Sequence, residues 1–150
     1  MDATTPQSPR TLRAIIEGQE LLTAATTTMV ADAARAMRNR KVGAILVVDG
    51  GTLAGIFTER DALFRVVAEG RDPNRTTLAE AMTKRPASIH LDRPFADALG
   101  IMHSGRFRHV PVVEDGRVIG MVSARDAMGP ELEQFMFSKI VEEQQRDVLA

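Results

Sequence analysis

The chain has 150 residues, enough for one ordinary domain or for two small domains that share a core, and 44% of its residues are hydrophobic. Its net charge of −1 gives the molecule no overall attraction for nucleic acid or for an anionic membrane. It has no cysteine, which excludes disulfides, thiolate metal ligands and thiol nucleophiles and is typical of a cytoplasmic protein.

The N-terminal stretch 1–13 is polar and contains prolines, and it lacks the apolar segment of a signal peptide. We therefore expect a flexible tail there. Apolar residues recur at helical spacing over Val30–Met37, with Thr28 as a possible N-cap.

Two strands are expected next. The apolar run Gly43–Val48 is typical of a buried strand, and the glycines of Asp49–Gly51 favour a hairpin turn that leads to a return strand over Leu53–Phe57. A second helix is expected to begin at Thr58 and to end near Ala68.

The second half of the chain repeats this order. Shifted by 65 positions, Val30–Asp61 aligns without a gap with Phe95–Asp126, and Gly70–Asn74 reads as the linker between the copies. One copy is too small to bury both faces of its sheet, so we expect the two to share a core. The duplication predicts a helix near Phe95–His103, strands over Val110–Val113 and Val118–Val122, and a helix from Ser123.

The last segment, Glu131–Leu149, is amphipathic, and Gly129–Pro130 marks its start. Such a helix either closes the repeat core or forms a contact in a dimer. Its apolar face carries Leu132, Phe135, Met136 and Ile140.

The two copies end in related heptads, Gly55–Asp61 and Gly120–Asp126, of the form Gly-x-x-Thr/Ser-x-x-Asp. Together with Arg108–Val113 and Ala81–Thr83, these heptads resemble the cystathionine β-synthase (CBS) domain family. The resemblance implies an α/β fold of two β-α-β-β-α repeats packed about a pseudo-two-fold axis, followed by a C-terminal helix. The expected organisation is a tail over 1–13, repeats over 14–72 and 73–130, and the helix over 131–150.

Each heptad has two compatible interpretations. The pairs Thr58/Asp61 and Ser123/Asp126 have nearly the spacing of a capping box, which would only satisfy free amides at a helix N-terminus. Those amides also suit an anion. Because a carboxylate repels phosphate, we expect Asp61 and Asp126 to accept hydrogen bonds from sugar hydroxyls, and Thr58 and Ser123 to suit the phosphate. The CBS resemblance implies the same roles.

Basic residues also occupy matched positions: Arg60 matches Arg125, and Arg106 matches a lysine. They fit either a solvated helix end or a phosphate clamp where the copies meet. Arg108 and His109 replace a glycine and an alanine of the first copy, which predicts two unequal sites.

The family resemblance also implies how the pockets are assembled. Each pocket combines the Asp motif of one repeat with the segment before the core helix of the other. Thr83 would then work with Asp61, and residues near Gln19 with Asp126. The segment around Gln19 lacks the Met-Thr pair that precedes the second core helix. Pro111, within the matching Arg108–Val113 stretch, is included among the expected ligand contacts.

The sequence shows no metal-ligand spacing around its three histidines, no nucleophile paired with a base and no Gly-rich phosphate loop. We therefore expect no enzyme, no metal and no covalent cofactor. The longest unbroken apolar run, Ala44–Val48, is too short to cross a membrane.

Three functions are compared. The first is a cytoplasmic regulatory module, a homodimer that binds AMP, ADP, ATP or another adenosyl compound between its repeats and acts on an unidentified protein. The second is a dimeric scaffold without a ligand, in which the heptads only cap helices. The third and least favoured is nucleic-acid binding through the arginine clusters, because the net charge is nearly neutral and stacking aromatics are few.

Overall fold

The computed structural model describes residues 8–127 and 129–149, so part of the expected tail (1–7), Met128 and Ala150 lie outside it. The first half contains α1 (Leu12–Ile16), β1 (Thr23–Ala25), α2 (Val30–Arg40), β2 (Ala44–Asp49), β3 (Thr52–Thr58), α3 (Glu59–Asp61) and the π-helical segment η1 (Ala62–Val67). The second half contains α4 (Leu78–Ala81), β4 (Thr83–Lys84), β5 (Ile89–His90), α5 (Phe95–Gly105), β6 (His109–Glu114), β7 (Arg117–Ser123), the 3₁₀ turn η2 (Ala124–Asp126) and α6 (Gly129–Leu149).

The fold reproduces the duplication to the residue. A shift of 65 converts the bounds of α2, β2 and β3 into those of α5, β6 and β7. It also relates the two left-handed helix C-caps, Lys41 and Arg106, and places the hairpin bulges after Val47 and Val112 at matched positions. The predicted pair of α/β repeats is confirmed.

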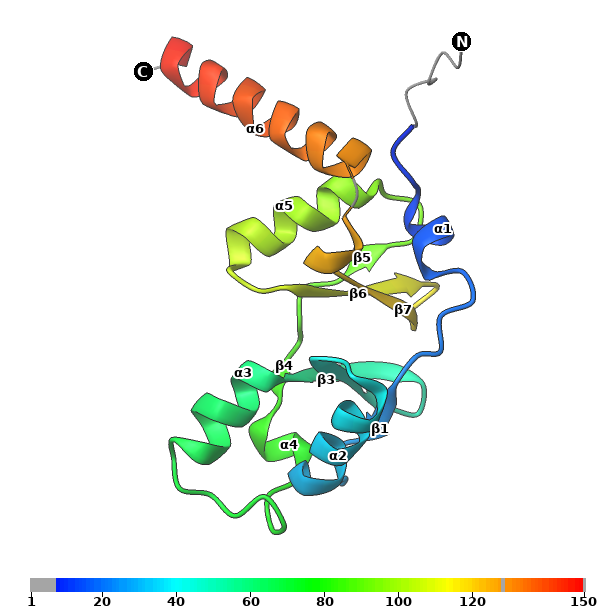
Figure 1. Ribbon diagram of the computed structural model, residues 1–150, viewed down its shortest axis with the longest axis vertical. Coiled ribbons are helices and arrows are strands. Elements are labelled where there is room, and N and C mark those ends of the chain that lie inside the picture. The colour runs from blue at the N-terminus through cyan, green and yellow to red at the C-terminus, as the bar shows by residue number, and fades with distance from the viewer. Residues whose placement is uncertain (1–7, 128, 150) are drawn as a thin grey trace.

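Each repeat contains a small sheet. The strand order is β1-β2-β3-β4 in the first and β5-β6-β7 in the second, with β1 and β5 parallel to the hairpin strands beside them. The two sheets face each other at the centre of the molecule, with α2 and α4 outside one and α5 and α6 outside the other (Figure 1).

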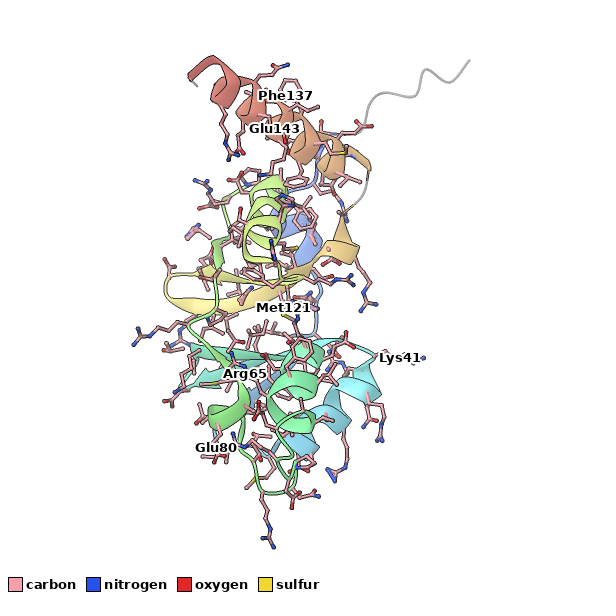
Figure 2. All side chains as sticks on the ribbon, turned by 90° about the vertical axis from the view of Figure 1, so that its left-hand side faces the viewer. Lys41, Arg65, Glu80, Met121, Phe137 and Glu143 are labelled. Carbon is pink, nitrogen blue, oxygen red and sulfur yellow. The ribbon has the colours of Figure 1, made fainter. Side chains whose placement is uncertain are left out.

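Strand β2 is apolar from Ala44 to Val48 because both of its faces are covered. Ile45 and Val47 pack into the core of the first repeat, whereas Leu46 packs toward Val118 and Met121 of the opposite sheet. Figure 2 shows Met121 at this junction between the repeats. A strand buried on both faces does not alternate between apolar and polar residues.

The short helices that precede each repeat are exchanged between the cores. Leu12 of α1 is fully buried with Ile89 and Val110 in the second repeat. Leu78 of α4 is fully buried among residues of the first repeat, next to Phe57. The expected boundary between residues 72 and 73 therefore divides the sequence copies but not the two cores, and the tail ends before Leu12.

Two predicted helix starts are wrong. Thr28 does not cap α2, because Met29 is the N-cap. The amides of Val30 and Ala31 donate to the backbone carbonyls of Thr76 and Pro73, which makes a side-chain cap unnecessary. The helix expected from Ser123 is a single 3₁₀ turn that ends at Asp126. The helix resumes only at the Gly129–Pro130 pair, because proline is tolerated in the first turn and disfavours helical geometry just before it.

Helix α6 only partly closes the core. Phe135 packs edge-to-face on His103 of α5, with ring centroids 5.9 Å apart. Leu132, Met136 and Ile140, expected on the packed face, are about half exposed, and Phe137 is 69% exposed and points away from the repeats (Figure 2). The closing-helix interpretation is thus right for Phe135 and wrong for the other three. No helix in the described ranges is long and apolar enough to span a bilayer.

Candidate functional site

A cavity of about 920 Å³ lies where the two repeats meet, and this volume is suitable for a nucleotide-sized ligand. Its walls come from the end of β3, from α3 and η1, from the segment after β4, and from the turn between α5 and β6. The lining residues are Gly43, Ile56, Thr58, Glu59, Arg60, Asp61, Leu63, Phe64, Thr83, Arg85, Pro86, Ala87, Arg106, Phe107, Arg108 and His109.

Asp61 forms the fixed polar centre of this cavity. Its Oδ2 accepts hydrogen bonds from the Thr58 amide at 3.0 Å and from the Thr58 hydroxyl at 3.1 Å, and the Asp61 amide donates back to that hydroxyl at 3.1 Å. Thr58 and Asp61 therefore form the capping box that their spacing predicts. Asp61 is only 7% exposed, yet it lines the cavity.

The expected pairing of Thr83 with Asp61 is present. The Thr83 hydroxyl donates to Asp61 Oδ1 at 3.0 Å, and the Thr83 backbone pairs with Ile56 across β3 and β4. This close approach depends on Gly55, because a Cβ at that position would lie 2.8 Å from the Thr83 carbonyl oxygen. The glycine of the heptad thus brings the pre-helix segment within reach of the aspartate.

The basic side of the cavity comes from both repeats. Arg60 donates to the backbone carbonyl of Arg106 at 3.2 Å, and its guanidinium lies 5.4 Å from the centre of the Phe64 ring. Arg85 and Arg108 complete the set of lining arginines. Arg60 and Arg106 lie where the copies meet, which is the position that the phosphate-clamp interpretation requires.

His109 begins β6 and lines the same cavity. Burial lowers the pKa of its imidazole below 6.5, and the positive charge of Arg125 lowers it further. Glu59 and Asp126 act in the opposite direction but do not reverse the shift.

The second heptad does not build a matching site. Asp126 accepts a hydrogen bond from the Ser123 amide at 2.7 Å, but Gly18 stands where the first site has Thr83 and offers no hydroxyl. The Gln19 side chain instead bonds to both backbone groups of Met121, at 2.8 and 2.9 Å. Met121 is the counterpart of Ile56 in the cavity wall, so the edge of β7 is satisfied by a side chain rather than by a strand.

Four expected ligand residues lie outside the cavity lining. Pro111 is fully buried in β6, because the strand is covered on this face as well. Ser123, Arg125 and Asp126 belong to the second heptad, whose pre-helix partner is missing.

Phe64 and Phe107, which supply the aromatic part of the wall, are among the lining residues that sequence reasoning missed. Arg85 lies in the segment Met82–Pro86, which the family resemblance placed at the base pocket, and it follows β4 in a left-handed backbone conformation at φ 49°. Next to the lining, Arg65 contacts Asp61 Oδ1 at 3.5 Å and donates to the Met82 carbonyl at 2.8 Å. The i,i+4 spacing of Asp61 and Arg65 was a signal for this contact.

The geometry defines a class of protein: a two-repeat module with a ligand-sized cavity at the junction. The family model described as CBS domain matches residues 16–68 and 78–129. The chain belongs to the CBS domain family.

Relatives and solved structures agree with this assignment. A CBS domain-containing protein of Arabidopsis thaliana, CBSCBSPB2, is 43% identical over 96 residues, which are 63% of this chain and 18% of that protein. The chain therefore spans less than a fifth of this relative. The CBS domain pair of protein MJ0100, solved with 5′-methylthioadenosine and S-adenosylmethionine, is 28% identical, with a TM-score of 0.69 over 78% of this chain and 95% of that one. A CBS domain protein from Pyrobaculum aerophilum, solved with AMP, has the same fold at 19% identity, with a TM-score of 0.77 over 85% and 99% of the two chains.

Proposed function

We propose that this chain is a regulatory module, without catalytic activity of its own, that binds an adenine nucleotide or related adenosyl ligand in the cavity at Asp61. The observation that carries the proposal is the constellation of Asp61, Thr58 and Thr83, contributed by both sides of the linker and fixed by hydrogen bonds of 3.0–3.1 Å. The adenosyl ligands named for the MJ0100 pair support the ligand class.

Within the cavity, the chemistry assigns a role to each wall. A carboxylate with two oxygens has about four acceptor positions, and Thr58 and Thr83 occupy three at Asp61. A sugar hydroxyl can take the remaining position. The arginines suit a phosphate, and Phe64 and Phe107 offer flat apolar surface for a base.

The two heptads provide a matched pair of variants to test this proposal. Asp61→Ala and Asp126→Ala each remove a carboxylate that accepts from the amide of its cap residue, which costs about 1 kcal/mol of stability, and Asp61→Ala costs more because that carboxylate also accepts from the Thr58 and Thr83 hydroxyls. Only Asp61→Ala should abolish binding in calorimetric titrations with AMP, ADP and ATP. Absence of binding heat with these nucleotides, NAD and S-adenosylmethionine would leave the ligand-free scaffold as the function.

Self-association is the second part of the proposal. Leu132, Met136, Phe137 and Ile140 leave exposed apolar surface on α6, next to Phe135, which packs on α5. We expect a second copy to cover this face in a homodimer, which then acts on a partner protein that the ligand regulates.

Nucleic-acid binding is less favoured because the basic clusters are divided. Arg40 contacts Glu20, with its Nη2 2.7 Å from the Glu20 carbonyl oxygen and 3.5 Å from its carboxylate. Arg106 and Arg108 line the cavity instead of extending a basic surface from Arg40.

A further inference from the structure

The cavity carries more positive charge than its carboxylates balance. Arg60 and Arg85 line it from the first repeat and the segment after β4, and Arg106 and Arg108 line it from the second repeat. Among the described side chains, none of these four guanidinium groups forms an ion pair with a carboxylate.

The acidic side chains of the lining are two, and one of them is already engaged. Asp61 is held by Thr58, Thr83 and the ion pair with Arg65, which is not itself a lining residue. Glu59 is the other, and its carboxylate folds over Gly43, where no Cβ blocks it. The lining therefore holds four guanidinium groups and one carboxylate, that of Glu59, that has no ion-pair partner among the described residues. This excess of positive charge can balance several negative charges on a ligand.

The Thr58 hydroxyl, which was expected to bind phosphate, already forms hydrogen bonds within the protein. The Thr58 hydroxyl donates to Asp61 Oδ2 and accepts from the Asp61 amide, so it serves the helix cap. Phosphate recognition then falls mainly to the arginines, whose planar guanidinium groups grip phosphate oxygens in pairs. Arg85 and Arg106 hold left-handed backbone conformations at φ 49° and 58°, which arginine rarely adopts, and both side chains still line the cavity.

We propose that this cavity selects a nucleoside di- or triphosphate over AMP, and rejects cationic adenosyl compounds such as S-adenosylmethionine. This selectivity rests on the proposed nucleotide site and specifies the charge of the nucleotide that the site binds. The positive charges of the lining arginines from the two repeats repel one another across the cavity. A polyphosphate between them removes that repulsion and holds the repeats together, so the ligand's phosphate number sets how firmly the junction closes.

Calorimetric titration with ATP, ADP, AMP and S-adenosylmethionine, without divalent cations, tests the proposal. Each additional phosphate gains charge-assisted hydrogen bonds, so we expect ATP to bind at least about tenfold more tightly than AMP. S-adenosylmethionine should bind least. Arg85→Gln and Arg108→Gln should reduce the ratio of ATP to AMP affinity, whereas Arg117→Gln, an equal charge change outside the cavity lining, should leave it unchanged.

The possible results distinguish a failure of charge selection from a failure of nucleotide binding itself. AMP or S-adenosylmethionine binding as tightly as ATP would overturn the charge selection while leaving the nucleotide site in place. An affinity ratio unchanged in both Arg85→Gln and Arg108→Gln would also overturn it. Binding of none of the four compounds contradicts the proposed function itself.

Discussion

The ion pair between Arg10 and Glu131 is the contact whose loss should affect stability most. Arg10 Nε lies 2.7 Å from Glu131 Oε1, and Arg10 Nη2 donates to the Asp126 carbonyl at 2.5 Å. The Glu131 side chain is 1% exposed and that of Arg10 is 33% exposed. Arg10→Ala would thus leave a carboxylate buried without its partner at the start of α6.

The expected cost follows from this burial. Removing one partner of a buried pair typically costs about 3–5 kcal/mol, and because Arg10 is partly open to screening water we expect about 2–3 kcal/mol. For a chain of this size that loss lowers Tm by about 4–12 °C. Urea unfolding followed by circular dichroism measures the free energy, and a thermal scan measures Tm.

Arg13→Ala is the matched control for Arg10→Ala. Arg13 is 67% exposed, and its contacts with Glu114 and Asp92 are 3.5 and 3.9 Å long. Exposed pairs of this kind contribute up to about 1 kcal/mol. Equal destabilisation by Arg10→Ala and Arg13→Ala would refute the reasoning. Recovery of stability in Arg10→Met combined with Glu131→Leu would support it, because apolar residues of similar volume can replace a buried pair.

Three further predictions follow from other contacts. Gly55→Ala should destabilise the protein by about 1–3 kcal/mol, because its Cβ would meet the Thr83 carbonyl, and nucleotide affinity should fall with it; Gly100→Ala, where a Cβ meets open space on α5, should leave affinity unchanged. The lowered pKa of His109 means that the unfolded chain binds more protons as pH falls below 6.5, so the unfolding free energy should decrease there, and His109→Gln should flatten that part of the pH profile. Phe137→Ser should reduce the mass measured by light scattering from dimer to monomer while helix content stays constant, and an unchanged mass would exclude this face as the dimer contact.

The sequence was sufficient to predict the repeated architecture, because the duplication constrains both copies together. Helix α2 and strands β2 and β3 recur as α5, β6 and β7 at the predicted shift. Local sequence signals predicted the helix starts wrongly where residues distant in the sequence contact the helix. Thr28 is a good cap residue, but the backbone carbonyls of Pro73 and Thr76 accept from the first amides of α2. The heptad that contains Ser123 predicted a helix like the one that follows Thr58, but the helix begins only at Gly129, next to Pro130.

The site was predictable as far as the motifs extended. The spacing of Thr58 and Asp61 and the family resemblance of Thr83 predicted a cluster that the structure shows in hydrogen-bond contact. Phe107 was missed because only the folded chain brings residues from both repeats to one cavity. The predicted inequality of the two sites has a physical basis in Gln19, whose side chain occupies the edge of β7.

The exchange of α1 and α4 between the cores has a consequence for how the protein is made. Leu12 leaves the ribosome early, but its packing partners include Val110 and Val122, which are synthesised near the end. The second core therefore cannot close until the strand that contains Val122 has been made, although Leu12 is made long before it. A chain cut within Gly70–Asn74 should consequently yield two fragments that are each incomplete, and that regain the native fold only when mixed.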